Sequence, residues 1–465
     1  MVIAVPAAAL KPPALPLAAP LQGTLKISRI RPKARGARLI RWGAANFLCF
    51  LWGDVIIFPD KTPRRAAPDK AWKPKGGTAG RDLDTMGILP FLFLLLLTGA
   101  WGYQLLALVS LWRFFAAAAA PLPRPEGVGI TVFKPLKGLE ATTRECLESF
   151  LTQDWRPCQV LFGVRDQDDP VVPLLRELQR THAGPEIEIV FCPQLLGLNP
   201  KISSLRQLEE RARYDLLVIA DADVKVGPDF LSRVAAAFKD PEVGLVSCPY
   251  RSGPAQTLGA QLEALTIAAD FIPSVATAHY VEGIRFALGA AMALTRRALL
   301  ASGGFAPLAD YLADDFQLGR RVAAAGLQVR LLPYVVETQT PMMSFKDYLA
   351  HQLRWARTYR VCRPKGYLAY GITHALVFSL ALGGVTGAPL WVLALILATM
   401  ALRMTLAVCS ERFCLLGHLP GNSFWLLPLK DLLSFALWAL SFLGSRVTWG
   451  HRSYLVNREG KLLKI

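Results

Sequence analysis

The chain has 465 residues, a hydrophobic fraction of 53% and a mean hydropathy of +0.33, which exclude disorder as its main state and allow two or three domains. Its formal net charge is +17, but residues 1–85 alone hold 15 Lys and Arg against 5 Asp. Because this basic excess is not interleaved with aromatic residues over the rest of the chain, nucleic-acid binding is disfavoured.

Residues 1–85 are rich in Pro, Ala, Lys and Arg and contain no pattern that would build a core. We expect them to be a disordered leader. A transit-like peptide fits the basic, acid-poor composition, and an over-extended start fits equally well because Met86 directly precedes a hydrophobic run.

That run, from Ile88 to Leu111, has 24 residues and no charge. At about 1.5 Å per residue it reaches about 36 Å, which exceeds a hydrocarbon core of about 30 Å. The sequence therefore predicts a transmembrane helix over 86–115, with a short linker after it. The alternatives are a buried core helix or an uncleaved signal sequence.

Residues 126–345 alternate short β-branched runs with charged helical stretches. This alternation predicts an α/β domain, with a mostly parallel sheet that is covered on both faces. The expected strands are 130–133, 160–164, 187–191, 216–220 and 243–248. Because ligands bind at the carboxyl ends of such strands, acidic residues that directly follow a strand are candidate site residues.

Two acidic loops follow expected strands. The first carries Asp166, Asp168 and Asp169, which would repel one another unless they bind donors or cations. The second is a D-x-D formed by Asp221 and Asp223, whose side chains project the same way from extended backbone and can share one divalent ion with phosphate ligands. By itself a D-x-D is more often a surface turn.

A third acidic pair, Asp314 and Asp315, opens an amphipathic helix, where both residues could simply favour the helix dipole. Upstream lie a small-residue stretch over 289–294, the pair Arg296 and Arg297, and a Gly-Gly turn. We expect small residues there to let the backbone approach a ligand.

Residues 346–365 are expected to form an interfacial helix that presents His351, Arg354 and Trp355. Basic and aromatic side chains of this kind suit a diphosphate beside a membrane, and they suit anionic lipid as well.

Hydrophobic sequence returns in residues 366–408, where a Gly/Thr/Pro break predicts a transmembrane hairpin of two helices. Within 409–465, a third membrane or re-entrant segment over 424–443 carries Lys430 and Asp431, which are costly inside a span unless they are paired. A basic tail follows, and the sequence leaves its side of the membrane open.

In order, these motifs resemble those of inverting glycosyltransferases with a GT-A catalytic domain. More narrowly, the chain is similar to the ceramide glucosyltransferase family (family 2/21 type), which includes bacterial hopanoid glucosaminyl transferases. The segments that carry the resemblance are VFKPLKGLE (132–140), VRDQDDP (164–170), GLNPKISSL (197–205), LADD (312–315) and HQLRW (351–355). His351 departs from the Q/R-x-x-R-W pattern at its first position, whereas Arg354 and Trp355 match it.

The resemblance implies an α/β GT-A (Rossmann-like) domain between N-terminal and C-terminal transmembrane helices. It implies Asp315 as the catalytic general base, and Asp223 with Asp221 as ligands of Mg²⁺ or Mn²⁺. The implied donor-binding residues are Lys134, Asp166, Asp168, Asp169, Lys201, Asp221, His351, Arg354 and Trp355.

The expected activity is transfer of a sugar from a UDP-sugar to a lipid hydroxyl, with inversion. Ceramide glucosyltransferase is the first expectation, and a hopanoid (bacteriohopanetetrol) N-acetylglucosaminyl transferase is the alternative. The expected location is the bacterial inner membrane, with the catalytic domain in the cytoplasm. A polymerising glycan synthase generally needs more spans, and a non-catalytic membrane receptor that binds nucleotide is the alternative of another class.

Overall fold

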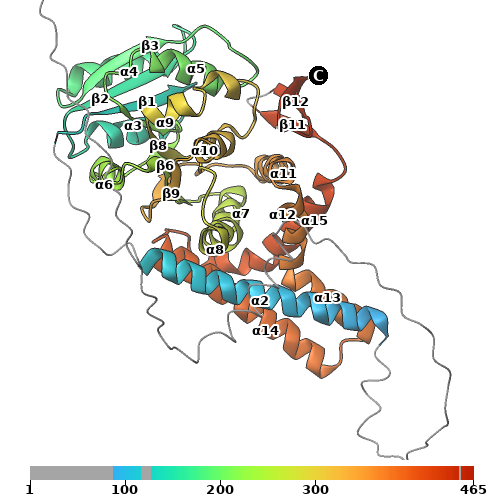
Figure 1. Ribbon diagram of the computed structural model, residues 1–465. Helices are drawn as coiled ribbons and strands as arrows, with labels where there is room; N and C mark the ends of the chain where they lie inside the picture. The colour runs from blue at the N-terminus through green and yellow to red at the C-terminus, as the bar shows by residue number, and fades with distance from the viewer. Residues whose placement is uncertain (1–86, 117–126, 450–451) are drawn as a thin grey trace, which may run out of the picture. The chain divides into compact units, whose positions relative to one another are not determined.

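The computed structural model describes residues 87–116, 127–449 and 452–465, all within one compact unit, Phe58–Ile465 (Figure 1). The predicted leader, its suggested start site and most of the predicted linker lie outside the described residues.

A seven-stranded sheet in the order β3-β2-β1-β4-β8-β6-β9 forms the centre of the α/β domain. The strands β1 to β4 are mutually parallel, as predicted, and all five expected strands are present. The strands are β1 (Ile130–Leu136), β2 (Cys158–Val164), β3 (Glu186–Phe191), β4 (Leu216–Ala220), β6 (Val243–Ser247), β8 (Ala291–Thr295) and β9 (Gln328–Leu331).

Helices cover this sheet on both faces, because its strands carry apolar side chains on both faces. Val132 and Val218 pack with α3, α4 and α6, whereas Phe133 and Ile219 pack with α5, α9 and α10. The sheet and its helices form the predicted α/β domain with a mostly parallel sheet covered on both faces. The helices are α3 (Thr143–Leu151), α4 (Val172–Thr181), α5 (Pro200–Glu209), α6 (Phe230–Ala237), α9 (Arg296–Ala301) and α10 (Asp314–Ala324).

The small-residue stretch over 289–294 corrects one expectation. Most of it belongs to β8, which lies antiparallel between β4 and β6 in the middle of the sheet. Arg296 and Arg297, which follow β8, lie at the opposite edge of the sheet from the acidic loops, where Arg296 is 2.9 Å from Asp215. The small side chains within β8 therefore serve strand packing, and the two arginines are not part of the site.

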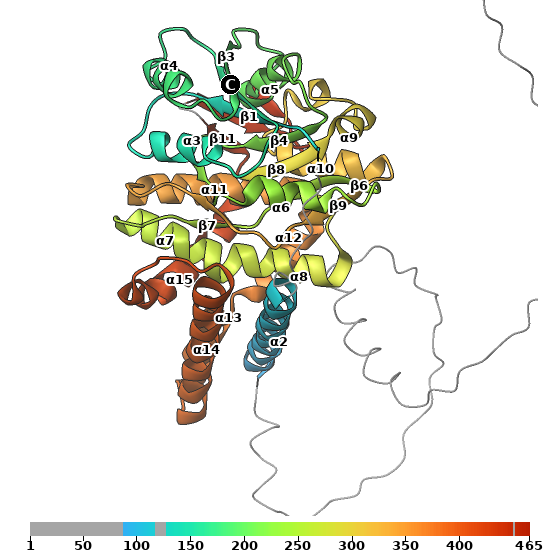
Figure 2. The ribbon, with the colours of Figure 1, turned by 90° about the vertical axis from the view of Figure 1, so that its left-hand side faces the viewer.

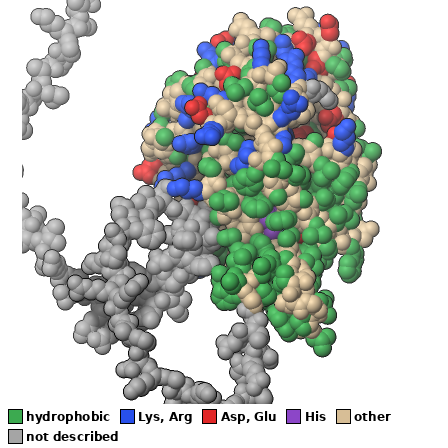
Figure 3. Space-filling model, turned by 90° about the vertical axis from the view of Figure 1, so that its right-hand side faces the viewer, with side chains coloured by type: hydrophobic (Ala, Val, Ile, Leu, Met, Phe, Trp, Pro, Cys, Tyr) green, Lys and Arg blue, Asp and Glu red, His purple; other side chains and the backbone are tan. Residues whose placement is uncertain are grey.

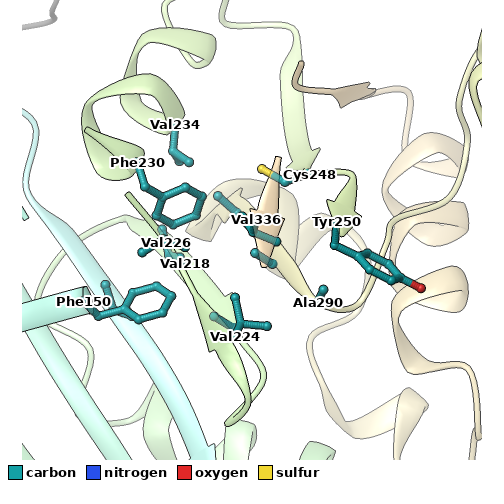
Figure 4. Packing of buried hydrophobic residues seen from close by; sticks show 14 of the residues in the cluster. Phe150, Val218, Val224, Val226, Phe230, Val234, Cys248, Tyr250, Ala290 and Val336 are labelled. Atoms are coloured by element: carbon teal, nitrogen blue, oxygen red, sulfur yellow. The ribbon is translucent and has the colours of Figure 1, made fainter. Parts of the chain in front are cut away.

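A second sheet in the order β5-β10-β7 extends the core towards the membrane helices. Phe150, Phe230 and Val336 fill the space between it and the central sheet, and Tyr250 lies at the margin with its hydroxyl directed away (Figure 4). The strands of this sheet are β5 (Val224–Lys225), β7 (Tyr250–Ser252) and β10 (Val336–Thr338). The remaining helical elements of this part of the chain are η3 (Ala306–Leu308) and one continuous helix made of α7 (Leu258–Thr266), η2 (Ile267–Phe271) and α8 (Ile272–Glu282).

The membrane region comprises three helices long and apolar enough to cross a bilayer, or four if a bent pair forms one span, within the described part of the chain. α13 and α14 run beside α2, whereas α15 lies across their direction (Figure 2). The elements are α2 (Ile88–Ala116), α11 (Phe345–Cys362), α12 (Pro364–Tyr370), η4 (Gly371–Thr373), α13 (Ala375–Thr386), α14 (Leu390–Val408), η5 (Cys409–Cys414), η6 (Gly421–Leu426) and α15 (Leu427–Ser441).

The break between α13 and α14 falls at residues 387–389, inside the Gly/Thr/Pro segment where the sequence predicts a turn. On the face drawn in Figure 3, Lys, Arg, Asp and Glu side chains gather at one end and the other end is almost wholly hydrophobic. Exposed residues such as Leu390, Leu397 and Ile88 belong to α14 and α2, as expected of lipid-facing helices.

The last residues of the chain are more than a basic tail. They form an antiparallel sheet of β11 (Arg446–Trp449), β12 (Arg452–Val456) and β13 (Leu462–Lys464). Its inward-facing residues Val447, Tyr454 and Leu462 pack on Leu312 of the catalytic domain. Charge and length alone did not reveal this sheet, because its strands are short and rich in arginine and lysine.

Candidate active site

The carboxyl ends of β1, β2 and β4 bring three loops to one edge of the central sheet. The strands are neighbours in the order β2-β1-β4, so the loops that follow Leu136, Val164 and Ala220 lie side by side. Residues just before β8 reach the same edge, since Ala291 pairs with Ala220. The predicted acidic loops therefore share one edge with the residues before β8.

Asp169 connects the first two of these loops. Its carboxylate accepts hydrogen bonds from the backbone N–H of Gly138, at 2.9 and 3.0 Å, and from that of Val171, at 3.0 Å. Gly138 has a φ of +75°, a conformation that glycine adopts without strain. Asp166 and Asp168 are exposed. Asp169 therefore fixes the loop, and Asp166 and Asp168 remain open to a ligand.

Lys134 holds the D-x-D loop from beneath. Its ammonium is fully buried, donates to the backbone carbonyl of Asp221 at 2.5 Å and lies 4.4 Å from the centre of the Phe150 ring. Desolvation lowers the pKa of Lys134 to about 8, although the nearby carboxylates of Asp223 and Asp221 oppose this. The side chain contacts the loop backbone and not open space.

Asp223 fits a divalent cation. Desolvation and then the charge of Asp221 raise its pKa to about 6 against the opposing charge of Lys134. Its carboxylate has no ion-pair partner among the described residues, so a cation would relieve this unfavourable charge.

No third His, Cys, Asp or Glu joins this pair to form a metal-binding group in the described ranges. An ion here would therefore take other oxygen ligands, and Mg²⁺ characteristically takes one or two carboxylates together with phosphate oxygens.

Lys201 joins the D-x-D loop to the third acidic loop. Its ammonium lies 2.5 Å from Asp221 Oδ1 and 3.8 Å from Asp314 Oδ2. Burial acts to lower the pKa of Lys201, but the charges of Asp221 and Asp314 outweigh it and hold that pKa above its usual range. The other oxygen of Asp314 accepts from Asn199 Nδ2 at 3.3 Å. The ammonium of Lys201 therefore holds both acidic loops together.

Asp315 is the next residue on α10, and it lies against Gly289. A Cβ atom on Gly289 would be 2.7 Å from Asp315 Oδ2, so only glycine leaves room for the carboxylate. Desolvation, and then the charge of Asp314, raise the pKa of Asp315 to about 7, against the effect of Lys201. A carboxyl with this pKa can accept a proton near neutral pH.

The helix predicted to be interfacial is α11, and the side chains of His351, Arg354 and Trp355 have different surroundings. His351 Nδ1 lies 3.0 Å from Glu263 Oε1, and Gln352 donates to Glu263 Oε2 at 2.8 Å. Glu263, on α7, is almost fully buried. The pair thus anchors α11, and no sequence pattern marks Glu263 because its surroundings are apolar.

Arg354 carries a guanidinium without a side-chain partner in the described part of the chain. Desolvation lowers its pKa, while the charges of Glu263 and others nearby act to raise it. An arginine held away from water without a carboxylate partner is suited to bind an anionic group bidentately.

Trp355 belongs to an aromatic cluster with Tyr250, Phe271 and Tyr359. Its ring centre lies 5.4 Å from that of Phe271 and 6.0 Å from that of Tyr359. Tyr359 keeps 40% of its surface accessible, and yet desolvation raises the pKa of its hydroxyl well above the usual value. The cluster therefore presents an accessible aromatic ring close to Asp315, whose charge also acts on the Tyr359 hydroxyl.

A pocket of about 530 Å³ lies elsewhere, beside Asp215, Arg296 and Leu300. These residues are at the edge of the sheet opposite the acidic loops, where β4 begins and β8 ends. The pocket holds none of the carboxylates that surround Lys201, so it is not the candidate active site.

Comparisons with known proteins identify the family of the chain. Residues 92–462 match the family model of glycosyl transferase family 21. A ceramide glucosyltransferase 1 of Caenorhabditis elegans is 23% identical over 270 residues, 57% of this chain and 58% of the relative. An N-acetylglucosaminyltransferase of Rhizobium meliloti is 25% identical over 340 residues, 64% of this chain and 75% of the relative.

The chain therefore spans little more than half of the length of the ceramide glucosyltransferase 1 relative. Among solved structures, the mannosyltransferase PcManGT of Pyrobaculum calidifontis, in complex with GDP-Man and Mn²⁺, aligns with a TM-score of 0.44 and 19% identity, covering 76% of this chain and 99% of that one.

Proposed function

Because the chain belongs to glycosyl transferase family 21, we propose that it transfers a sugar from a UDP-sugar to the hydroxyl of a membrane lipid, with inversion at the anomeric carbon. The observation that carries the proposal is the position of Lys201, which lies 2.5 Å from Asp221 and 3.8 Å from Asp314. The carboxylates suited to a metal and to proton transfer are thereby gathered around one site.

The donor would lie over the carboxyl ends of the strands. Asp166 and Asp168 are exposed and free to meet the uracil and ribose, while Asp169 shapes their loop through Gly138. Lys134 and Lys201 would contribute to donor binding by holding the D-x-D loop and its carboxylates in place. The guanidinium of Arg354 would bind the diphosphate and stabilise charge that develops on the leaving UDP.

Asp223, with Asp221, would hold Mg²⁺ or Mn²⁺ at the diphosphate. The fit rests on two carboxylates, one of them desolvated and without an ion-pair partner in the described chain. When bound, such an ion offsets the negative charge of the leaving group.

Asp315 would act as the general base. With a pKa of about 7, its carboxylate can take the proton from the lipid hydroxyl while that oxygen attacks the anomeric carbon. The new glycosidic bond forms on the face opposite the departing UDP, so the configuration inverts. His351 would act indirectly, through Glu263, by fixing the helix that carries Arg354 and Trp355.

Ceramide is the acceptor that we propose first, because ceramide glucosyltransferases of several organisms are among the relatives that the chain matches. A hopanoid N-acetylglucosaminyl transferase is the second candidate, since the rhizobial N-acetylglucosaminyltransferase aligns over a larger share of this chain. Either lipid would present its hydroxyl beside the aromatic cluster of Trp355 and Tyr359.

Hydrogen bonds on either side of the η6–α15 segment support a specific membrane topology. Before η6, Arg251 of β7 donates to the carbonyls of Leu415, at 2.9 Å, and Leu416, at 2.7 Å. After α15, Arg360 of α11 donates to the carbonyl of Gly444 at 2.8 Å. We infer that both ends of this segment would lie on the side of the catalytic domain, so that η6 and α15 would not cross the membrane.

By this reasoning α2 and the α13–α14 hairpin are the spans, and α15 rests at the surface of the bilayer. Lys430 and Asp431 need not face lipid, because Lys430 lies 2.6 Å from Asp270 and Arg403 lies 2.6 Å from Asp431. Arg113 lies at the end of the first span, so the positive-inside tendency favours a cytoplasmic catalytic domain, and the membrane that we propose is the bacterial inner membrane.

The test combines each candidate donor with each candidate acceptor. Purified membranes are incubated with radiolabelled UDP-glucose or UDP-N-acetylglucosamine, with ceramide or bacteriohopanetetrol, with and without EDTA. We expect one labelled glycolipid, which EDTA suppresses. Labelled UDP retained by the protein, without labelled lipid from any pair or from a total lipid extract, would instead identify a nucleotide-binding receptor.

An Asp315→Asn variant completes the test. General-base catalysis contributes about 10² to 10⁴ in rate, so the variant should lose most turnover and retain UDP binding. Glu210→Gln is the control, since Glu210 is an exposed carboxylate 3.0 Å from Arg206 on α5. Retention of more than about a tenth of wild-type turnover would rule out Asp315 as the base.

A further inference from the structure

The C-terminal sheet β11–β13 contacts the segment that leads to the acidic residues Asp314 and Asp315. The backbone N–H of Leu462 donates to the carbonyl of Asp310 at 2.7 Å, and that of Leu312 donates to the carbonyl of Gly460 at 3.4 Å. Between them, Tyr311 forms a β-bridge with Lys461. Residues 310–312 thus form an added edge of the C-terminal sheet, and α10 begins with Asp314 two residues later.

The other side of residues 310–312 is held by the loop before α5. The side chain of Asp310 accepts from the backbone N–H of Leu198 at 2.9 Å, and Asn199 Nδ2 donates to the carbonyl of Tyr311 at 2.9 Å. Asn199 also bonds to Asp314, and its neighbour two residues on is Lys201. The segment before Asp314 is therefore fixed from both sides, by the loop that leads into α5 and by the C-terminal sheet.

The same sheet also holds α11. Arg360 donates to the carbonyl of Gly444, and Arg357, one turn after Arg354, donates to the carbonyl of Arg446. Val361 of α11 packs against the apolar face of the sheet, which Leu462 completes. A sheet far along the chain from both elements therefore connects the helix that carries Arg354 with the segment that carries Asp315.

We infer that the C-terminal sheet is a positioning element for catalysis, with Leu462 and Leu312 as its central contact. It sets the Asp314–Asp315 segment relative to Arg354, and so sets the base relative to the diphosphate. This inference rests on the proposed function, because it assumes that Asp315 deprotonates the acceptor. No residue of the sheet is required to touch the substrate.

The test compares two adjacent leucines of β13 in the full-length, membrane-embedded protein. Leu462 is buried against Leu312, whereas the side chain of Leu463 is 46% exposed. Leu462→Ala should lower kcat for lipid transfer by about 10- to 10²-fold, because small displacements of reacting groups are costly. The KM for donor and the Kd for UDP should change by less than about twofold, since the metal-binding loop is untouched.

Donor hydrolysis separates positioning from a loss of folded protein. Water can replace the lipid hydroxyl without needing its alignment, so Leu462→Ala should raise the ratio of UDP-sugar hydrolysis to lipid transfer. Leu463→Ala should behave as wild type. The conservative change Leu462→Met, which refills the contact, should restore most transfer.

Three results would overturn the inference: equal behaviour of the two alanine variants, a parallel fall of transfer, hydrolysis and UDP-binding capacity, or no recovery with Leu462→Met. If the wild-type protein glycosylates no lipid, the proposed function is refuted instead. This result is known before any variant is compared.

Discussion

The ammonium of Lys201 lies 2.5 Å from the carboxylate of Asp221, although Lys201 is in the first turn of α5 and Asp221 directly follows β4. This ion pair, extended to Asp314 at 3.8 Å, explains how acidic groups can gather without mutual repulsion. It also implies that the arrangement of the site depends on one lysine that need not touch the substrate.

Replacing Lys201 by Met should therefore disrupt both loops. We expect kcat to fall by about 10² to 10³, the range seen when a preorganised electrostatic contact is lost. We also expect a stability loss of about 1–3 kcal/mol, because Asp221 and Asp314 lose a partially buried partner. Turnover and thermal unfolding measure the two effects. The matched control is Lys239→Met, which removes an exposed lysine and should change neither. Near-normal turnover of Lys201→Met would refute this role.

Transfer should depend on pH through Asp315. Because its pKa is raised to about 7, kcat should fall as the pH drops below about 7 and the base becomes protonated. The folded protein also holds this proton more tightly than the unfolded chain does. Asp315 therefore contributes stability below about pH 4 that is lost as the pH rises through about 7.

Two measurements test the expected pH dependence of kcat and of stability. A profile of kcat from about pH 5 to about pH 9 should show the acidic limb, and a flat profile would contradict the assignment. Wild-type melting temperature should fall relative to that of Asp315→Asn as the pH rises over the same interval, since other groups cancel in this comparison.

Removal of divalent metal should abolish transfer, and Asp223→Asn should weaken binding of Mn²⁺ in the presence of UDP. The expected loss reflects the position of Asp223, whose carboxylate is desolvated and lacks an ion-pair partner in the described chain. Mn²⁺ binding is followed by electron paramagnetic resonance, independently of turnover. Glu210→Gln, at an exposed position outside the site, should leave Mn²⁺ affinity unchanged. Equal Mn²⁺ affinity of wild type and Asp223→Asn would show that the ion binds elsewhere.

Cysteine labelling tests the topology of α15. Leu416→Cys and Leu443→Cys place thiols before η6 and after α15, at positions that are 65% and 80% exposed. An impermeant maleimide should label both from the same side of sealed vesicles, above the background of native cysteines. Ala388→Cys, in the turn between α13 and α14, should be labelled from the other side. Labelling of the two ends of α15 from opposite sides would show that α15 spans the membrane.

Much of the catalytic fold was predictable because buried parallel strands leave clear apolar runs. The bounds of β4 agree with the prediction, and Asp314 and Asp315 open a helix as expected. β8 was missed because its sequence, AMALT, is dominated by small residues and not by β-branched ones. Its identity as a strand comes from pairing with β4 and β6, which are distant in the sequence.

The site was predictable in its acidic residues and less so in how they are held. D-x-D spacing suggests a shared cation, but nothing local in the sequence indicates that Lys134 faces the backbone or that Lys201 joins two loops. Glu263 and Leu462 act through contacts with residues that lie about a hundred positions away or more. Such roles depend on tertiary packing, which residue spacing does not encode.

The most direct test of the account is a structure of the protein with UDP and Mn²⁺ bound. We predict that Mn²⁺ lies at the carboxylate of Asp223, that the diphosphate bridges Mn²⁺ and the guanidinium of Arg354, and that Asp315 faces the space beyond the terminal phosphate, where the sugar would lie. Density for UDP in a different cavity from Asp315, or for Mn²⁺ away from Asp223, would contradict the central claim that these groups form a single catalytic site.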